Sequence, residues 1–125
     1  MNSDRFNEGL EIRKKVLGEE HVKKSLASPD DFGRALQELV TEYCWGAAWA
    51  RPGLDHKTRS MLNIAMLTAL NRPHEVRLHV GGALRNGCTK EEILEVLIQA
   101  CIYCGVPAAM DSLRVAKSTF AEMEK

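Results

Sequence analysis

Apolar residues recur at intervals of three and four positions along much of the chain, a spacing that predicts amphipathic helices. The first predicted helix covers residues 3–17 and ends at Gly18. The second begins at Ser28-Pro29-Asp30-Asp31, which supplies a capping hydroxyl, a proline for the first turn and two acids that favour a helix N-terminus. It ends at Arg51-Pro52-Gly53, and no run alternates β-branched and polar residues as a strand would.

Capping residues, prolines and glycines mark four more helices in the second half of the chain. These markers are Asp55, Pro73, Asn86-Gly87, the capping box Thr89-Lys90-Glu91-Glu92, Gly105 and Pro107. Together the patterns predict an all-α fold, a bundle of about six helices.

Two of these helices, through residues 61–70 and 93–104, carry apolar residues around most of their circumference. A helix of this kind must be buried on every side. A chain of 125 residues is expected to form a single domain, 1–125, and to bury only about two-thirds of its surface. We therefore expect the remaining apolar surface to be covered by other copies of the chain, in a homo-oligomer.

Composition argues against several classes of partner. Seventeen basic residues balance seventeen acidic ones, so the chain has no net field that would attract nucleic acid or an anionic membrane surface. No apolar run approaches the roughly 20 residues that span a bilayer, and the N-terminus does not resemble a signal peptide. We expect a cytoplasmic protein whose cysteines stay reduced.

The densest group of chemically useful residues lies at positions 71–79, where a predicted helix begins. Glu75 and His79 are four positions apart and so share one face of that helix. A carboxylate there would hold one imidazole nitrogen and raise the pKa of the histidine toward neutrality, which makes His79 a candidate general acid. The alternative is a solvated pair on a surface helix.

A zinc site at His74 and Glu75 is not expected. The metalloprotease pattern places two histidines four positions apart on one helix face. His74 and His79 are five positions apart and diverge around the helix. We therefore predict no metal.

A second candidate segment begins with Glu42 and contains both tryptophans of the chain. Trp45 and Trp49 share one helix face, and the small residues between them suit a hollow walled by two indoles. Arg51 lies at the end of this helix, where its guanidinium would fit a carboxylate. The alternative is an aromatic core patch with an arginine that complements the helix dipole. Arg59, in the first turn of the next helix, is a further candidate for a pocket.

Cys101 and Cys104 form a C-x-x-C motif. Reactive pairs of this kind usually lie at a helix N-terminus, where the helix dipole lowers the thiol pKa. This pair lies at the end of a predicted helix, so core packing is a better interpretation than redox chemistry.

Residues 42–109 resemble the carboxymuconolactone decarboxylase family. The matching pieces are EYCWGAAWARPGLDHKTRSM and LTALNRPHEVRLHVGGALRNGCTKEEILEVLIQACIYCGVPAA, in order and without large gaps. The Trp-Gly-x-x-Trp-x-Arg-Pro-Gly segment and the Glu-x-x-x-His helix resemble the γ-carboxymuconolactone decarboxylases in particular. The resemblance implies the alkylhydroperoxidase D-like helical fold.

Peroxidases of that wider group carry a redox C-x-x-C followed four residues later by a histidine. His79 fits the histidine, but Arg72 and Glu75 occupy the cysteine positions, and roughly Ser60 occupies the place of an upstream glutamate. The chain therefore departs from the peroxidase pattern, and Cys101 and Cys104 belong to a different helix.

The resemblance implies decarboxylation of 4-carboxymuconolactone to 3-oxoadipate enol-lactone in protocatechuate catabolism (the β-ketoadipate pathway), by a hexamer or another ring. It implies a dianionic lactone as substrate and no cofactor, because the conjugated lactone carbonyl accepts the electrons that CO2 leaves behind.

On this hypothesis Arg51 or Arg59 binds a carboxylate, and Glu75 orients His79. His79 stabilises the oxyanion and delivers the proton, while the indoles of Trp45 and Trp49 exclude water. Glu42 is grouped with the substrate-binding residues.

Two other functions remain open from the sequence. One is a thiol-dependent peroxidase or disulfide reductase that uses Cys101 and Cys104. The other is an oligomer that binds a small metabolite without transforming it.

Overall fold

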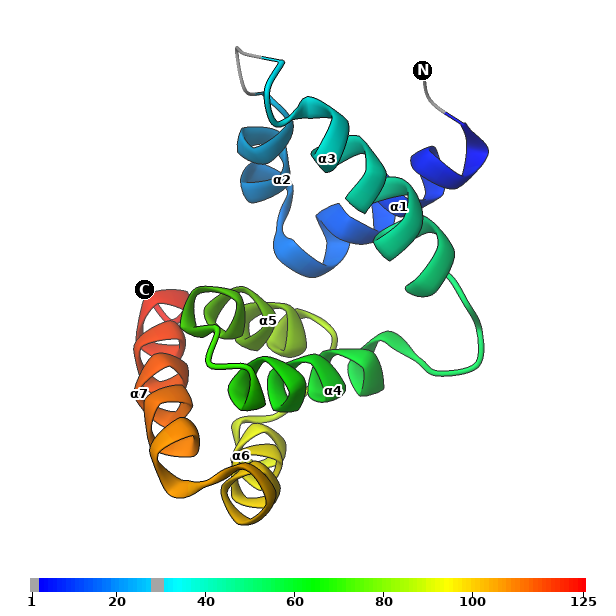
Figure 1. Ribbon diagram of the computed structural model, residues 1–125. Helices are drawn as coiled ribbons and strands as arrows, with labels where there is room; N and C mark the ends of the chain where they lie inside the picture. Colours follow the sequence, from blue (N-terminus) through cyan, green and yellow to red (C-terminus); the bar gives the residue numbers. More distant parts are fainter. Residues whose placement is uncertain (1–2, 28–30) are drawn as a thin grey trace. The chain divides into compact units, whose positions relative to one another are not determined.

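The computed structural model describes residues 3–27 and 31–125 of the chain. The contacts divide the chain into two compact units, residues 1–55 and 56–125. All regular secondary structure in the described ranges is helical (Figure 1), so the predicted all-α class is confirmed. No helix within these ranges is long and apolar enough to cross a membrane.

The N-terminal unit contains four helical segments. They are α1 (Asp4–Leu17), α2 (Glu19–Leu26), α3 (Arg34–Leu39) and the π-helix η1 (Val40–Ala48). The predicted helix over residues 3–17 is confirmed: the Ser3 hydroxyl accepts a hydrogen bond from the backbone N–H of Phe6, and Gly18 ends the helix with φ of 95°.

Helix α2 has no counterpart among the predicted elements. Its sequence EEHVKKSL buries only Val22, so it carries almost no apolar periodicity from which a helix could be predicted. Most of the start signal predicted at Ser28-Pro29-Asp30-Asp31 lies outside the described residues. Within them, the next helix begins at Arg34.

The segment that carries the tryptophans is a π-helix rather than an α-helix, and its last turn is closed by a hydrogen bond from the Trp49 N–H to the Cys44 carbonyl oxygen (3.0 Å). Helix α1 packs against it at two glycines. A Cβ on Gly9 would collide with the Thr41 carbonyl oxygen and the Gly46 backbone, and a Cβ on Gly46 would collide with the backbone of α1. The two backbones therefore touch, and only glycine fits at the crossing.

A buried guanidinium joins α1 to both α3 and η1. Arg13 of α1 donates to the Thr41 hydroxyl (3.0 Å) and to the Gln37 side-chain oxygen (2.9 Å). Burial lowers the pKa of Arg13, although the nearby Cys44 opposes that effect. Because both acceptors are neutral, these hydrogen bonds satisfy donors without cancelling the buried charge.

The C-terminal unit is made of four α-helices with sharply defined ends. They are α4 (His56–Ala69), α5 (Pro73–Arg85), α6 (Lys90–Cys104) and α7 (Val106–Met123). The predicted boundaries are confirmed: Pro73 lies in the first turn of α5, and Thr89 and Glu92 form a reciprocal capping box. Gly87 and Gly105 have φ of 93° and 105°, backbone conformations that L side chains rarely adopt.

The core of this unit is formed by side chains from all four helices and from the turn before α6. Its members are Ile64, Val76, Val80, Ala83, Cys88, Ile93, Leu97 and Ala116. A 2.7 Å hydrogen bond between the Thr68 and Ser112 hydroxyls joins α4 and α7 in the interior. Each hydroxyl thereby has a partner, which reduces the cost of burying it.

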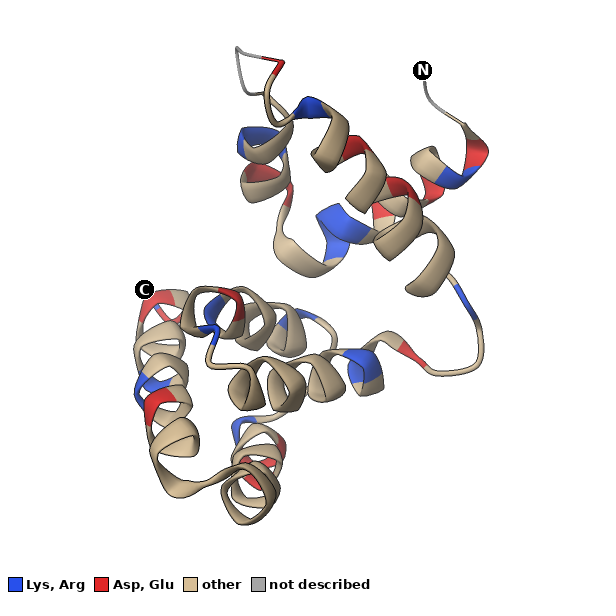
Figure 2. Ribbon diagram, viewed as in Figure 1, with Lys and Arg blue, Asp and Glu red and all other residues tan. Residues whose placement is uncertain are grey.

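Two apolar stripes stay uncovered in this single chain. One stripe runs along a face of α4 and past its end, and consists of Leu62, Met66 and Leu70. The other runs along a face of α6 and consists of Leu94, Ile98 and Ile102, with 76% of Ile102 exposed. Figure 2 shows no charged residue on α4 after its first turn, nor between the second half of α6 and the start of α7. The expected burial of these helices on every side is therefore not achieved within one chain.

Because the helix crossing in the N-terminal unit has no room for a methyl group, we expect Gly9→Ala to lower the free energy of unfolding by about 1–3 kcal/mol or more. The matched control is Gly53→Ala in the same unit, where a Cβ would meet nothing within 4 Å. Urea unfolding followed by circular dichroism measures both. Equal stabilities for the two variants would contradict the close crossing.

Candidate active site

Helix α5 holds Glu75 and His79 on one edge of its buried face. Val76 and Val80 of the same helix are almost wholly buried in the core, whereas Glu75 and His79 are half-buried. Because His79 follows Val76 by three positions, its ring lies close to the part of α5 that packs on α4. The sequence-predicted pair is therefore brought together, one turn apart, between core and surface.

Helix α4 provides the neighbour of the imidazole. The side-chain nitrogen Nδ2 of Asn63 lies 3.4 Å from Nδ1 of His79, a long hydrogen bond in which the amide N–H is the donor. Arg59 lies four positions before Asn63 and so shares its face of α4, one turn nearer to the helix N-terminus. The amide of Asn63 therefore contacts the imidazole, the carboxylate of Glu75 acts on the same ring, and Arg59 lies one turn away on α4.

The charge state of His79 differs from the sequence-based expectation. Burial lowers the pKa of His79 from 6.5 to about 4, and the negative charge of Glu75 opposes this shift without overcoming it. The prediction that Glu75 raises the pKa of the histidine toward neutrality is therefore wrong. The physical reason is that the ring loses more hydration than a half-buried carboxylate can replace.

The remaining predicted site residues belong to the N-terminal unit. The indoles of Trp45 and Trp49 are stacked with centroids 4.6 Å apart, and both are buried. They contact one another instead of facing each other across a gap, which favours the aromatic-core alternative for this pair. Glu42 accepts a hydrogen bond from the Ser3 hydroxyl (2.6 Å), and Arg51 is exposed just beyond η1. A contact between these residues and a substrate stays a prediction.

The cysteine pair lies where the sequence placed it, at the C-terminal end of α6, and is not joined in a disulfide. Cys101 is half-buried, but Cys104 is exposed, so the core-packing interpretation holds for at most one of them in this chain. No cluster of three or more potential metal ligands occurs among residues 3–27 and 31–125.

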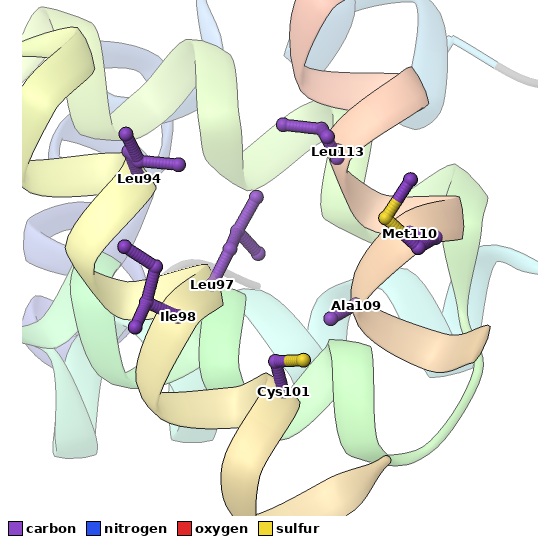
Figure 3. Close-up of a pocket in the computed structure, with 7 residues that line it drawn as sticks. All are labelled: Leu94, Leu97, Ile98, Cys101, Ala109, Met110 and Leu113. Carbon is purple, nitrogen blue, oxygen red and sulfur yellow. The ribbon is translucent and has the colours of Figure 1, made fainter. Parts of the chain in front are cut away.

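An open pocket of about 140 Å³ lies between α6 and α7 (Figure 3). It is lined by apolar side chains and one thiol: Leu94, Leu97, Ile98, Cys101, Ala109, Met110 and Leu113. A dianionic ligand needs cationic or hydrogen-bonding groups, and this lining has none to pair with a carboxylate. The pocket is therefore a poor candidate for the anion-binding site.

Asn63 is the site residue that the sequence analysis missed. It is a polar residue within the apolar run of residues 61–67, one helical turn after Arg59. That position was the sequence feature from which Asn63 could have been predicted as a candidate. Helix periodicity shows that the two share a face, but not that this face meets His79.

The lowered pKa of His79 predicts a pH-dependent contribution to stability. Between pH 6.5 and about 4 the unfolded chain binds a proton at this position that the folded chain does not, so stability falls as the pH falls. The loss amounts to at most about 3 kcal/mol, and less where water reaches the ring.

Urea unfolding of wild type and His79→Gln at about pH 7 and about pH 4 isolates the contribution of His79 to the free energy of unfolding. Other titrating groups affect both proteins equally, so their effects cancel when the two proteins are compared. We expect the variant to lose less stability on acidification. Equal losses in the two proteins would contradict a neutral, buried imidazole.

Comparison with known proteins identifies the chain's relatives. Residues 34–118 match the model of the carboxymuconolactone decarboxylase family, a match that runs through the boundary between the two units. A 4-carboxymuconolactone decarboxylase from Acinetobacter baylyi is 40% identical over 124 residues, which cover 98% of this chain and 92% of the relative.

Two further relatives extend the comparison. A nitrosuccinic acid decarboxylase from Metarhizium robertsii is 42% identical, over 94% of this chain and 82% of its own length. An uncharacterised 15.0 kDa protein from Paracoccus denitrificans is 37% identical, over 74% of this chain and 75% of its own length. The family match and the alignments with the two decarboxylases show that the chain belongs to the carboxymuconolactone decarboxylase family.

Proposed function

We propose that this protein is a cofactor-independent carboxy-lyase that converts 4-carboxymuconolactone to 3-oxoadipate enol-lactone, a step of protocatechuate catabolism. The observation that carries the proposal is the 40% identity to a 4-carboxymuconolactone decarboxylase along nearly the whole of both chains. The local support is the row formed by Arg59 and Asn63 of α4 with Glu75 and His79 of α5. These residues include a guanidinium that can bind a carboxylate and an imidazole that can carry a proton.

The reaction needs no external electron acceptor. When the carbon–carboxylate bond breaks, CO2 departs and the bonding electrons move through the ring alkene to the lactone carbonyl oxygen. The resulting oxyanion is protonated on the carbon next to the carbonyl, which forms the enol-lactone. The protein must bind two negative groups, stabilise the oxyanion and deliver one proton.

In this proposal a guanidinium binds a substrate carboxylate. Arg59 is the stronger candidate because it shares the α4 face of Asn63, which contacts His79. Arg51 belongs to the other unit, beyond η1, and is the second candidate. Trp45, Trp49 and Glu42 also belong to that unit, and contact of these residues with the substrate stays a prediction.

His79 carries the proton in this mechanism. Its ring is neutral at pH 7, and a doubly negative ligand beside it favours the charged form, so the ring is expected to take up a proton from solvent when the substrate binds. The imidazolium then stabilises the oxyanion and protonates the carbon, while Glu75 supports the positive charge one helical turn away.

The nitrosuccinic acid decarboxylase supports a second candidate substrate. A nitro group, like a conjugated lactone carbonyl, stores on oxygen the electrons that a departing CO2 leaves. The same arginine and histidine chemistry would therefore serve nitrosuccinic acid. The lactone is preferred because alignment with the lactone decarboxylase covers more of both chains.

We propose that the protein acts as a homo-oligomer, with a hexamer as the expected size, in the cytoplasm. The support is the exposed apolar stripe of α6, at Leu94, Ile98 and Ile102, which continues into the pocket beside α7. Apolar patches of this kind on a soluble protein mark association surfaces. Side chains of the α6 stripe of one copy can fill the open pocket of another copy, so that the apolar surfaces of both become buried.

Turnover without any cofactor is the direct test of the reaction. Purified protein mixed with 4-carboxymuconolactone should release CO2 as the substrate's ultraviolet absorbance falls, and nitrosuccinic acid in a parallel assay measures the second candidate. We expect His79→Gln to lower kcat by about 10²–10⁴-fold, since it removes the acid. Arg59→Gln should mainly raise KM, because it removes a carboxylate partner from α4.

The matched control is the double variant Cys101→Ser/Cys104→Ser. It should keep wild-type turnover, whereas a peroxidase or disulfide reductase would lose all activity. Near wild-type kcat in His79→Gln would overturn the assignment of the acid. Binding of the lactone without release of CO2 would instead identify a metabolite-binding oligomer.

The association surface is tested by placing a charge on the α6 stripe. We expect the wild type to sediment as an oligomer and Ile98→Glu to dissociate, because the interface would bury an unpaired carboxylate. Gln99→Glu adds the same charge at the next, exposed position and serves as the control. A wild type that sediments as a monomer at micromolar concentration would contradict the proposal.

A further inference from the structure

The contact between Asn63 and His79 indicates which ring nitrogen of His79 carries the proton. Nδ1 of the imidazole lies 3.4 Å from the Asn63 side-chain nitrogen, and that nitrogen can only donate. A neutral imidazole that accepts at Nδ1 must carry its single proton on Nε2. The α4 helix therefore favours one tautomer of the α5 histidine.

We propose that Asn63 is a positioning residue that sets the resting tautomer of His79, with the proton on Nε2. The proposal rests on the proposed function, because the tautomer matters catalytically only if His79 is the acid. It adds a residue and a role beyond the arginine, glutamate and histidine of that mechanism.

The kind of side chain at position 63 decides which tautomer is favoured. The Asn63 NH2 group faces Nδ1, so a neutral ring is satisfied when Nδ1 is an acceptor. An aspartate can only accept and would match a protonated Nδ1, whereas a leucine would match neither form.

The position of Asn63 in the fold supports a fixed role. It lies on α4 next to Ile64, which is wholly buried, and one turn after Ser60, which is also wholly buried. Its backbone is therefore held by the packing of α4 against α5 and α6. A ring that contacts a side chain on so constrained a helix has little freedom to turn.

The tautomer can be read directly by nitrogen NMR of ¹⁵N-histidine-labelled protein, because a protonated and an unprotonated ring nitrogen have well-separated shifts. The signals of His79 are those that vanish in His79→Gln. At neutral pH we expect the wild type to carry its proton on Nε2. A proton on Nδ1 in the wild type would overturn the inference, and this measurement requires no altered Asn63.

Substitutions at Asn63 then test the cause. In Asn63→Leu we expect the tautomer preference to weaken and kcat to fall roughly 10–100-fold, the effect typical of losing a residue that orients a functional histidine. In Asn63→Asp the proton should move to Nδ1, or the ring should become charged, since the carboxylate only accepts. Gln99→Ala, which removes an exposed amide from α6, should change neither tautomer nor kcat.

The outcomes separate this inference from the proposed function. An unchanged tautomer in both Asn63 variants would overturn the role of Asn63, even if His79→Gln were inactive. Conversely, an active His79→Gln would overturn His79 as the acid. The shift of the ring proton in Asn63→Asp would still establish the contact as the determinant of the tautomer.

Discussion

The packing of α4 on α5 is the contact on which the proposed chemistry of this protein depends. Ile64 from one helix and Val76 and Val80 from the other are almost fully buried, and their burial brings two polar edges into register. On one edge lie an arginine and an asparagine, and on the other a glutamate and a histidine. The two pairs lie on different helices, and the packing of the apolar residues between α4 and α5 brings these helices together.

The same packing determines the charge of the histidine. A ring close to a dry core loses the water that would solvate its cation, and one carboxylate a helical turn away does not replace that water. In the proposed mechanism, the ring becomes charged only when an anionic substrate lies beside it.

The sequence correctly predicted the helices whose ends are marked by capping residues, glycines or prolines. Gly18, Pro73, Thr89 and Gly105 act through backbone conformation or capping, and each lies where it was expected. Helix α2 was missed because a single buried valine makes no periodic signal. The wide turns of η1 were also missed, because apolar spacing along the chain does not distinguish a π-helix from an α-helix.

The site was predicted only in part, for related reasons. Glu75 and His79 were found because they lie one turn apart on the same helix. The pKa of the histidine was predicted in the wrong direction, because spacing along a helix reveals a charged neighbour but not the depth of burial. Asn63 was missed because its partner lies 16 positions away, on another helix.

The location of the two tryptophans has a practical consequence. Both indoles lie in the N-terminal unit, stacked on each other beside the glycine crossing, while the C-terminal unit contains neither. Intrinsic fluorescence is therefore a local probe of residues 1–55, whereas ellipticity averages over every helix. Superimposable melting curves from the two signals would show that both units unfold as one cooperative body, and separate midpoints would show that each holds its structure independently.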